Sequence, residues 1–280
     1  PLFFSLHLPA PSRFPHLSLR RPLPLYGPVV LRRLPGQDDG FALHPSRVPA
    51  DADLVVVGNP TNPTSRLHPR ASILALVCSG RLVVVDEAFM DVARGGGDSV
   101  LQDAIQGEGL VVIRSLTKTF ALAGIRVGYL VGSSDVIAEC ALTQPHWSVN
   151  SLAVAAAVAC AGTQGQEHTR AVRQDLSLWV SDLAARLTLV GLDVVCEPAG
   201  PFVLVHHHHA VRLRDGMRRR GFALRRGDTF PGLGPQWLRI AAREPAMADA
   251  LLAALAQELA SINHDRHDTA ASDQESEDLA

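Results

Sequence analysis

Lysine is almost absent from this chain. The 280-residue sequence has 26 lysine and arginine residues, and only Lys118 is a lysine. A guanidinium stays charged and cannot form a Schiff base, whereas a primary amine can. The single lysine is therefore a candidate for amine chemistry, although a leftover surface lysine would look the same by composition alone.

Closely spaced metal or disulfide ligands are also missing. The sequence has no Cys-x-x-Cys pair, and no carboxylate or cysteine accompanies the run His206–His209 at ligand spacing. We therefore expect no metal site, no disulfide framework and reduced thiols in a cytoplasmic protein. The cysteines are Cys78, Cys140, Cys160 and Cys196.

Long apolar runs and a large net charge are missing as well. No run reaches the ~18 residues of a membrane span, and "SLAVAAAVACAG" predicts a buried helix instead. A net charge of −2 with 5% aromatic residues argues against nucleic-acid and membrane partners.

The two ends of the chain differ from its middle. Residues 1–28 are rich in proline and contain no acidic residue, since Asp38 is the first. They show no clear periodicity, so we expect an irregular N-terminus. Residues 263–280 are polar and acidic, which predicts a disordered tail.

Four short apolar runs in the first half predict strands, at 53–59, 81–87, 109–115 and 126–132. The runs are continuous rather than alternating, which is typical of strands buried on both faces of a sheet. Helical patterns separate the first three runs, so the sequence predicts an α/β fold. Ligands of such folds bind at the carboxyl ends of the strands.

The pattern changes after about Thr143. A helical stretch leads into short strands and helices that predict a second, smaller α+β unit. We expect a large domain over 29–150, and a helix with the small domain over 151–262.

Groups suited to a phosphate surround the lone lysine. Lys118 follows a predicted buried strand, and the hydroxyls of Ser115 and Thr117 lie beside it in sequence. Arg126 follows eight residues later. Hydroxyls and a guanidinium can hold a phosphate through charge-assisted hydrogen bonds.

Two further strand ends carry complementary chemistry. Asp86 ends a strand, where a carboxylate is costly without a cationic partner such as a protonated pyridine nitrogen. Asn62, between prolines, offers an amide to a phenolic oxygen. Lysine, aspartate, arginine and asparagine together match the needs of pyridoxal phosphate.

Three blocks of sequence carry a family resemblance. "NPTNPTS", "VVVDEAF" and "SLTKTFALAGIRVGY" resemble, in order, the signature blocks of the class I and II aminotransferases, which are fold-type I pyridoxal-phosphate enzymes. They are most similar to the branch that holds histidinol-phosphate aminotransferase and threonine-phosphate decarboxylase. The resemblance covers roughly 29–262. It implies a three-layer, mainly parallel large domain, pyridoxal 5'-phosphate as cofactor, a small-molecule amino-acid substrate and a homodimer.

The resemblance also implies roles around the cofactor ring. Lys118 would be the Schiff-base lysine, Asp86 would pair with the pyridine nitrogen and Asn62 would contact the ring hydroxyl. Phe89 stands beside the ring where many relatives have a tyrosine. Ser65 stands where the usual residue is glycine.

Anion-binding roles follow in the same way. Ser115, Thr117 and Arg126 would surround the phosphate. The block "QWLRIAAR" resembles the one whose arginine binds the substrate α-carboxylate, here Arg239. Without the resemblance, Arg239 would be interpreted as a solvent-facing strand arginine.

The family's N-terminal part has no counterpart in residues 1–28. That part supplies a phosphate-binding loop and a tyrosine that reaches the partner subunit's site. We therefore keep three hypotheses: transamination of a phosphorylated amino acid, decarboxylation as in the cobalamin pathway, and an aminotransferase-like protein with impaired cofactor binding. A nucleotide-binding domain is disfavoured because no Gly-x-Gly-x-x-Gly follows a strand.

Overall fold

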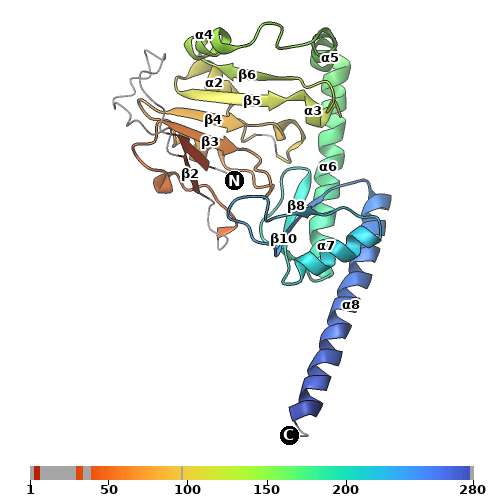
Figure 1. Cartoon of the computed structure of the whole chain (residues 1–280). Helices are drawn as coiled ribbons and strands as arrows, with labels where there is room; N and C mark the ends of the chain where they lie inside the picture. The colour runs from red at the N-terminus through yellow and green to blue at the C-terminus, as the bar shows by residue number, and fades with distance from the viewer. Residues whose placement is uncertain (1–2, 7–29, 34–38, 96, 278–280) are drawn as a thin grey trace.

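Two sheets organise the protein (Figure 1). The computed structural model describes residues 3–6, 30–33, 39–95 and 97–277. Sheet A has six strands, in spatial order β2 (Val30–Arg33), β1 (Phe3–Leu6), β3 (Leu54–Gly58), β4 (Leu82–Asp86), β5 (Leu110–Ser115) and β6 (Gly128–Gly132). Sheet B has four, in the order β7 (Asp193–Val194), β8 (Phe202–His206), β10 (Trp237–Ala241) and β9 (Arg225–Arg226).

The centre of sheet A is parallel. β3 pairs with β4 and β4 with β5 in parallel register, whereas β6 runs antiparallel to β5 and β1 antiparallel to β3. Crossovers between the parallel strands contain α1 (Arg70–Leu74) and α2 (Leu101–Gln106). The predicted α/β class is confirmed, and the carboxyl ends of β3, β4 and β5 meet at one edge of the sheet.

A long helix connects the two units. α6 (Thr163–Leu189) contacts the 3-10 turn η3 (Met90–Val92) of the large unit and β7 and β8 of the small one. In Figure 1 it runs from the edge of sheet A to sheet B. The remaining helical elements are η2 (Pro45–Arg47), α3 (Leu116–Thr119), α4 (Ser134–Thr143), α5 (Ser151–Ala161), α7 (Ala210–Arg219) and α8 (Pro245–Glu277).

One face of sheet A is buried and the other is only partly covered. The strand residues that face the core are Val55, Val57, Val83, Val85, Leu110 and Val112. Their neighbours on the opposite face of the two central strands, Leu54, Val56, Leu82 and Val84, keep intermediate exposure. The expectation of burial on both faces is therefore wrong for these strands. Runs of β-branched residues favour the extended backbone itself, so they did not distinguish the two cases.

The small unit has its own apolar core, formed by sheet B with α6, α7 and α8. α7 shows how its sequence produces this packing: Ala210, Leu213 and Met217 are fully buried at helical spacing, while Arg218 and Arg219 are exposed. This periodicity places one apolar stripe against the sheet and leaves the cations in solvent.

Two expectations about the ends of the chain differ from the structure. Phe3–Leu6 forms strand β1 rather than an irregular segment, consistent with the strand preference of phenylalanine; residues 7–29 lie outside the described part. The predicted disordered tail also differs, because α8 continues to Glu277. No glycine or proline occurs over 263–277 to end the helix.

The helix that we expected to be buried is α5, and the prediction of its burial is wrong. All its residues but Ser151 are apolar, yet only Ala153 is buried. Most of this apolar helix surface therefore faces solvent in the single chain. No helix in the described ranges combines the length and apolarity needed to cross a membrane.

The end of α6 offers a matched test of the small core. Leu187 is 0% exposed and Leu189 is 84% exposed. We expect Leu187→Ala to lower the free energy of unfolding by about 2–5 kcal/mol, because it removes buried methyl groups and leaves a cavity. Leu189→Ala should stay within about 0.5 kcal/mol of the wild type. Urea unfolding followed by circular dichroism measures both, and equal effects would contradict the observed packing.

Candidate functional site

The loop after β3 carries Asn62 and is held by internal hydrogen bonds. The backbone nitrogen of Thr61 donates to the carbonyl of Arg66 at 2.9 Å. Asn59 Oδ1 accepts from the backbone nitrogen of His68 at 2.7 Å. Asn59, Thr61 and His68 are buried, whereas Asn62 is exposed. The loop therefore presents the Asn62 amide from a fixed base.

Ser65 joins this loop to the small unit. Its φ of 62° lies in the left-handed region that side chains rarely adopt. Its carbonyl accepts from the backbone nitrogen of Ala199, and its Oγ accepts from that of Gly200, both at 2.8 Å. A glycine here would relax the backbone but leave the Gly200 nitrogen without this acceptor.

Cys196 adds a contact at the same junction. Its Sγ donates to the carbonyl of Thr64 at 3.1 Å. Burial raises the pKa of this thiol to about 11, so the thiol keeps its proton at neutral pH and remains a donor.

Asp86 ends β4 with its carboxylate exposed. The carboxylate accepts a hydrogen bond from the backbone nitrogen of Ala88 at 3.0 Å. In the sheet Asp86 pairs with Gly58 on β3 and with Ile113 on β5. It therefore lies level with the carboxyl ends of both neighbours, where the sequence predicted chemistry.

The turn after β5 carries Lys118. α3 is a single helical turn, and Lys118 is exposed on it. Its Nζ lies over the ring of Phe89, 5.5 Å from the centroid, an attractive arrangement for a cation and an aromatic face. Ser115 Oγ and Thr117 Oγ1 lie 2.7 Å apart, so the two hydroxyls stand together at the start of this turn.

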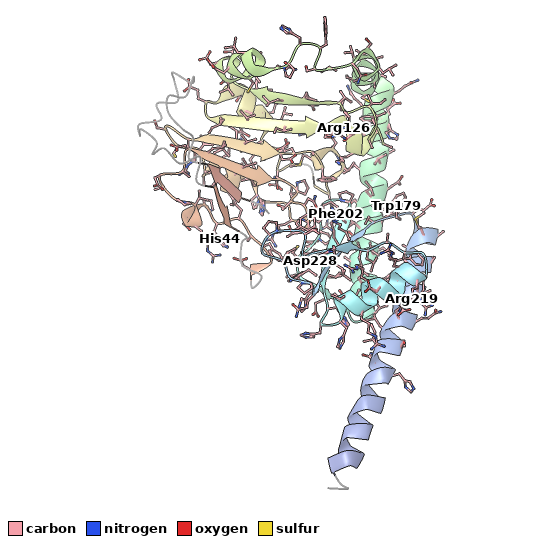
Figure 2. All side chains as sticks on the ribbon, viewed as in Figure 1. His44, Arg126, Trp179, Phe202, Arg219 and Asp228 are labelled. Carbon is pink, nitrogen blue, oxygen red and sulfur yellow. The ribbon has the colours of Figure 1, made fainter. Side chains whose placement is uncertain are left out.

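The segment that carries Arg126 contacts the turn through the neighbouring residue Val127. The nitrogen of Leu116 donates to the carbonyl of Val127 at 3.2 Å, which places this segment against the turn. Arg126 has a φ of 61° and is exposed, and its Nη1 donates to the carbonyl of Ala123 at 3.2 Å. Figure 2 shows Arg126 at the α3 end of the sheet. Its guanidinium thus bonds its own loop rather than the two hydroxyls.

Arg239 on β10 reaches across to the large unit. Its Nη1 donates to Asn62 Oδ1 at 2.6 Å, and its Cζ lies 4.8 Å from the ring centroid of Phe202. Phe202 meets Phe89 edge-on with centroids 5.3 Å apart, and Figure 2 places it where the two units meet. Continuous contacts therefore connect Lys118, Phe89, Phe202, Arg239 and Asn62.

Three charges in this region have no oppositely charged partner within the described residues. They are Lys118, Asp86 and Arg239, whose printed contacts are to an aromatic ring, a backbone nitrogen and an amide. Burial, and next the positive charge of Arg225, lowers the pKa of the Arg239 guanidinium. An anion beside it would offset that cost.

The Asn62–Arg239 bond also orients the asparagine. A guanidinium only donates, so the amide oxygen must face Arg239. The amide nitrogen of Asn62 remains a donor for a ligand oxygen.

A cavity of about 600 Å³ lies on the other side of the lysine turn. Leu116 and Phe120, which flank the turn, line it, but none of the predicted site residues does. Its other lining residues are Asp91, Tyr129, Ala157, Cys160, Ala161, Gln166, Thr169, Arg170 and Arg173. Within the described residues, no three His, Cys, Asp or Glu side chains are grouped to hold a metal ion.

Comparison with known proteins identifies the family. Residues 43–259 match the model of "Aminotransferase class I and II". The chain belongs to this aminotransferase family. All the predicted site residues lie inside the matched region.

Individual relatives agree with this assignment. A histidinol-phosphate aminotransferase of Mycobacterium tuberculosis (strain ATCC 25618 / H37Rv) is 45% identical over 203 residues, which are 72% of this chain and 55% of that protein. A threonine-phosphate decarboxylase of Sinorhizobium sp is 35% identical over 225 residues, 76% of this chain and 63% of that protein. The chain thus spans a little over half the length of the first of these relatives.

A solved structure shows the same fold. The histidinol-phosphate aminotransferase of Sinorhizobium meliloti, in complex with pyridoxal-5'-phosphate, superposes with a TM-score of 0.66 at 26% identity. The alignment covers 76% of this chain and 58% of that one.

Several residues around this candidate site could not be identified from the sequence. Phe202 begins an apolar strand, and nothing in "PFVLV" distinguishes it from core. Ser65 was noted only as a departure from the usual glycine, so its bond to Gly200 could not be foreseen. Glu87 and Arg114, discussed below, were hidden inside strand-like blocks.

His68 supports the Asn62 loop from below. Its Nε2 lies 3.1 Å from Thr61 Oγ1, which itself donates to the carbonyl of Gly58 at 2.7 Å. Thr61 therefore accepts from Nε2–H. His68 Nδ1 is buried without a hydrogen-bond partner. Burial, helped by the charge of Arg66, lowers the pKa of His68 from 6.5 to about 3.

Acid should therefore weaken the wild type more than a His68→Gln variant. The unfolded chain takes up a proton below pH 6.5 that the folded chain refuses until about pH 3, so stability is lost as pH falls through this window. We expect the wild type to lose about 1.4 kcal/mol per pH unit relative to the variant. Urea unfolding between pH 7.5 and 5 measures the difference.

His146→Gln is the matched control, since His146 is exposed. A pH-independent difference between the wild type and His68→Gln would contradict the buried neutral histidine.

Proposed function

We propose that this chain is a pyridoxal-phosphate-dependent aminotransferase that acts on a phosphorylated amino acid. The observation that carries the proposal is the contact series from Lys118 to Asn62, beside the unpaired carboxylate of Asp86. Family membership and the related structure in complex with pyridoxal-5'-phosphate support the choice of cofactor.

The residues present fit the ring end of this cofactor. Pyridoxal phosphate supplies an electron sink for a bond that breaks at the substrate's Cα. The Lys118 amine would hold its aldehyde carbon, and Asp86 would keep its ring nitrogen protonated. The Asn62 amide nitrogen, left as a donor by Arg239, would bond its ring oxygen. Phe89 would lie beside the ring.

The phosphate end is only partly assembled. The paired hydroxyls of Ser115 and Thr117 would bind the phosphate, with Arg126 as the cation. Because the Arg126 guanidinium bonds Ala123, it would have to turn toward the hydroxyls.

The chain's own groups then divide the work on the substrate. Arg239 would bind the substrate carboxylate through charge-assisted hydrogen bonds, since no carboxylate of the described residues occupies it. Lys118, exposed beside Phe89, would move the proton at Cα as general base. A phosphorylated substrate is proposed because the named relatives are histidinol-phosphate and threonine-phosphate enzymes.

Covalent trapping on the only lysine tests the cofactor. We expect borohydride to fix pyridoxal phosphate onto the peptide that contains Lys118, because the sequence has no other lysine. Mass spectrometry of the digested protein detects the adduct. Lys118→Arg keeps the charge, should show no adduct there and should lower kcat by about 10²–10⁴-fold. A colourless wild type with an unmodified Lys118 peptide would instead support the impaired, cofactor-free hypothesis.

Decarboxylation is the second candidate function. It is favoured by the 35% identity to a threonine-phosphate decarboxylase, an enzyme type that the resemblance connects with cobalamin biosynthesis. Both reactions use the same lysine, aspartate and arginine. Two incubations separate them, one with L-histidinol phosphate and 2-oxoglutarate and one with L-threonine phosphate and 2-oxoglutarate. Glutamate formation supports the aminotransferase, and CO₂ release from L-threonine phosphate with no glutamate in either incubation overturns it.

We also propose that the chain works as a homodimer whose interface includes α5. The helix is apolar on all sides, which suits a buried position, yet Leu152 and Val158 are 74% and 71% exposed. Nearby Trp147 is 97% exposed. The helix begins beside the site, because its cap Asn150 donates through Nδ2 to the carbonyl of Ile125 at 3.4 Å. A second copy would cover this surface and adjoin the Arg126 segment.

Charge placed on α5 should break this dimer. We expect the wild type to sediment as a dimer and the double variant Leu152→Glu, Val158→Glu as a monomer, since burying two unpaired carboxylates is costly. Leu189→Glu, at the far end of α6, is the control and should remain dimeric. A monomeric wild type would refute the proposal.

We also propose a cytoplasmic location. Cys78, Cys140, Cys160 and Cys196, all within the described residues, form no disulfide, which suits a reducing compartment.

A further inference from the structure

A buried ion pair lies behind the site and has no role in the chemistry described above. Glu87 Oε2 lies 2.8 Å from Arg114 Nη2. The Glu87 side chain is 0% exposed and that of Arg114 is 10% exposed. Burying two charges costs desolvation energy, so such a pair is weak support for stability by itself.

Residues of two nearby segments hydrogen-bond to the pair, Ser99 and Val100 before α2 and Asp91 in η3. Glu87 Oε1 accepts from the backbone nitrogen of Val100 at 2.9 Å, and Oε2 accepts from Ser99 Oγ at 2.8 Å. Arg114 donates to Ser99 Oγ at 2.9 Å and also pairs with Asp91. The carboxylate and the guanidinium are therefore held in one geometry.

The position of the pair in the sequence connects it to the site. Glu87 directly follows Asp86, and Arg114 directly precedes Ser115. Side chains alternate between the faces of a strand, so Arg114 and Ser115 point to opposite sides of β5. The backbone nitrogen of Glu87 also donates to the carbonyl of Ile113 at 2.9 Å. The ion pair thus holds the ends of β4 and β5 together on the face of the sheet opposite to Ser115.

We propose that Glu87 and Arg114 are positioning residues that set the spacing between Asp86 and the Ser115–Lys118 turn. This inference rests on the proposed function, because the spacing matters only if both elements hold one ligand. Asp86 would bond the ring nitrogen of that ligand. The Ser115–Lys118 turn would hold its aldehyde carbon and its phosphate. A shift of one strand end would move Asp86 relative to the ring.

Glu87→Gln tests the role while keeping the side chain's shape. Its amide can still accept from Val100, but the charge opposite Arg114 is lost. We expect the Kd for pyridoxal phosphate to rise about tenfold, because a misplaced Asp86 would lose binding free energy comparable to one hydrogen bond. We also expect the pH midpoint of the bound cofactor's visible absorbance to shift by about half a unit or more, because that midpoint depends on how Asp86 meets the ring nitrogen. Fluorescence titration and absorbance scans provide the two readouts.

Glu258→Gln is the matched control. Glu258 pairs with Arg220 at 2.7 Å in the small unit, away from the site. It should change neither the Kd nor the absorbance midpoint, whatever its effect on Tm. Arg114→Lys is the second test variant: it keeps the charge but loses the fork that reaches Glu87, Ser99 and Asp91 together. It should show the same spectral shift as Glu87→Gln.

The outcomes separate this inference from the proposed function. If the wild type takes up no cofactor, both proposals fall. If the wild type binds cofactor and the Glu87→Gln spectrum and Kd match those of the wild type, only this inference is overturned. It is also overturned if both variants fail to fold, since the pair would then serve the fold alone.

Discussion

The site depends on one junction, where the loop after β3 meets the segment before β8. Hydrogen bonds from Ala199 and Gly200 to Ser65, and from Cys196 to Thr64, join the two units there. Together with α6, which contacts both units, these bonds hold the Asn62 loop next to sheet B. The junction thus helps to place Asn62 Oδ1 2.6 Å from Arg239 Nη1.

The junction also explains why the aromatic residues lie between the units. Phe89 comes from the large unit and Phe202 from the small one, and their edge-on contact fills the space under Lys118 and Arg239. Each cation is attracted to the ring it contacts, Lys118 to Phe89 and Arg239 to Phe202. The two aromatic rings therefore connect the lysine of the large unit with the arginine of the small one.

Much of the large unit could be predicted from local pattern. The strands β3, β4, β5 and β6 fall within the predicted runs, and the residues after them are the ones that gather at the site. The face of the sheet could not be predicted, because valine suits a covered and an uncovered strand equally. The burial of α5 was wrongly predicted for a related reason. An apolar composition indicates that a helix is buried, but not whether its own chain or another one buries it.

Long-range contacts were the other limit. Lys118, Asp86 and Asn62 could be proposed as site residues because their chemistry is unusual near a strand end. Phe202 and Gly200 are chemically ordinary residue types, and each has a partner more than a hundred residues away, Phe89 and Ser65 respectively. The thiol of Cys196 at this junction has a consequence for durability. Oxidants attack thiolates, and a thiol whose pKa is about 11 offers almost none at neutral pH. Cys196 is thus a poor target for oxidants at neutral pH, whereas the exposed Cys78 and Cys140 would be attacked first.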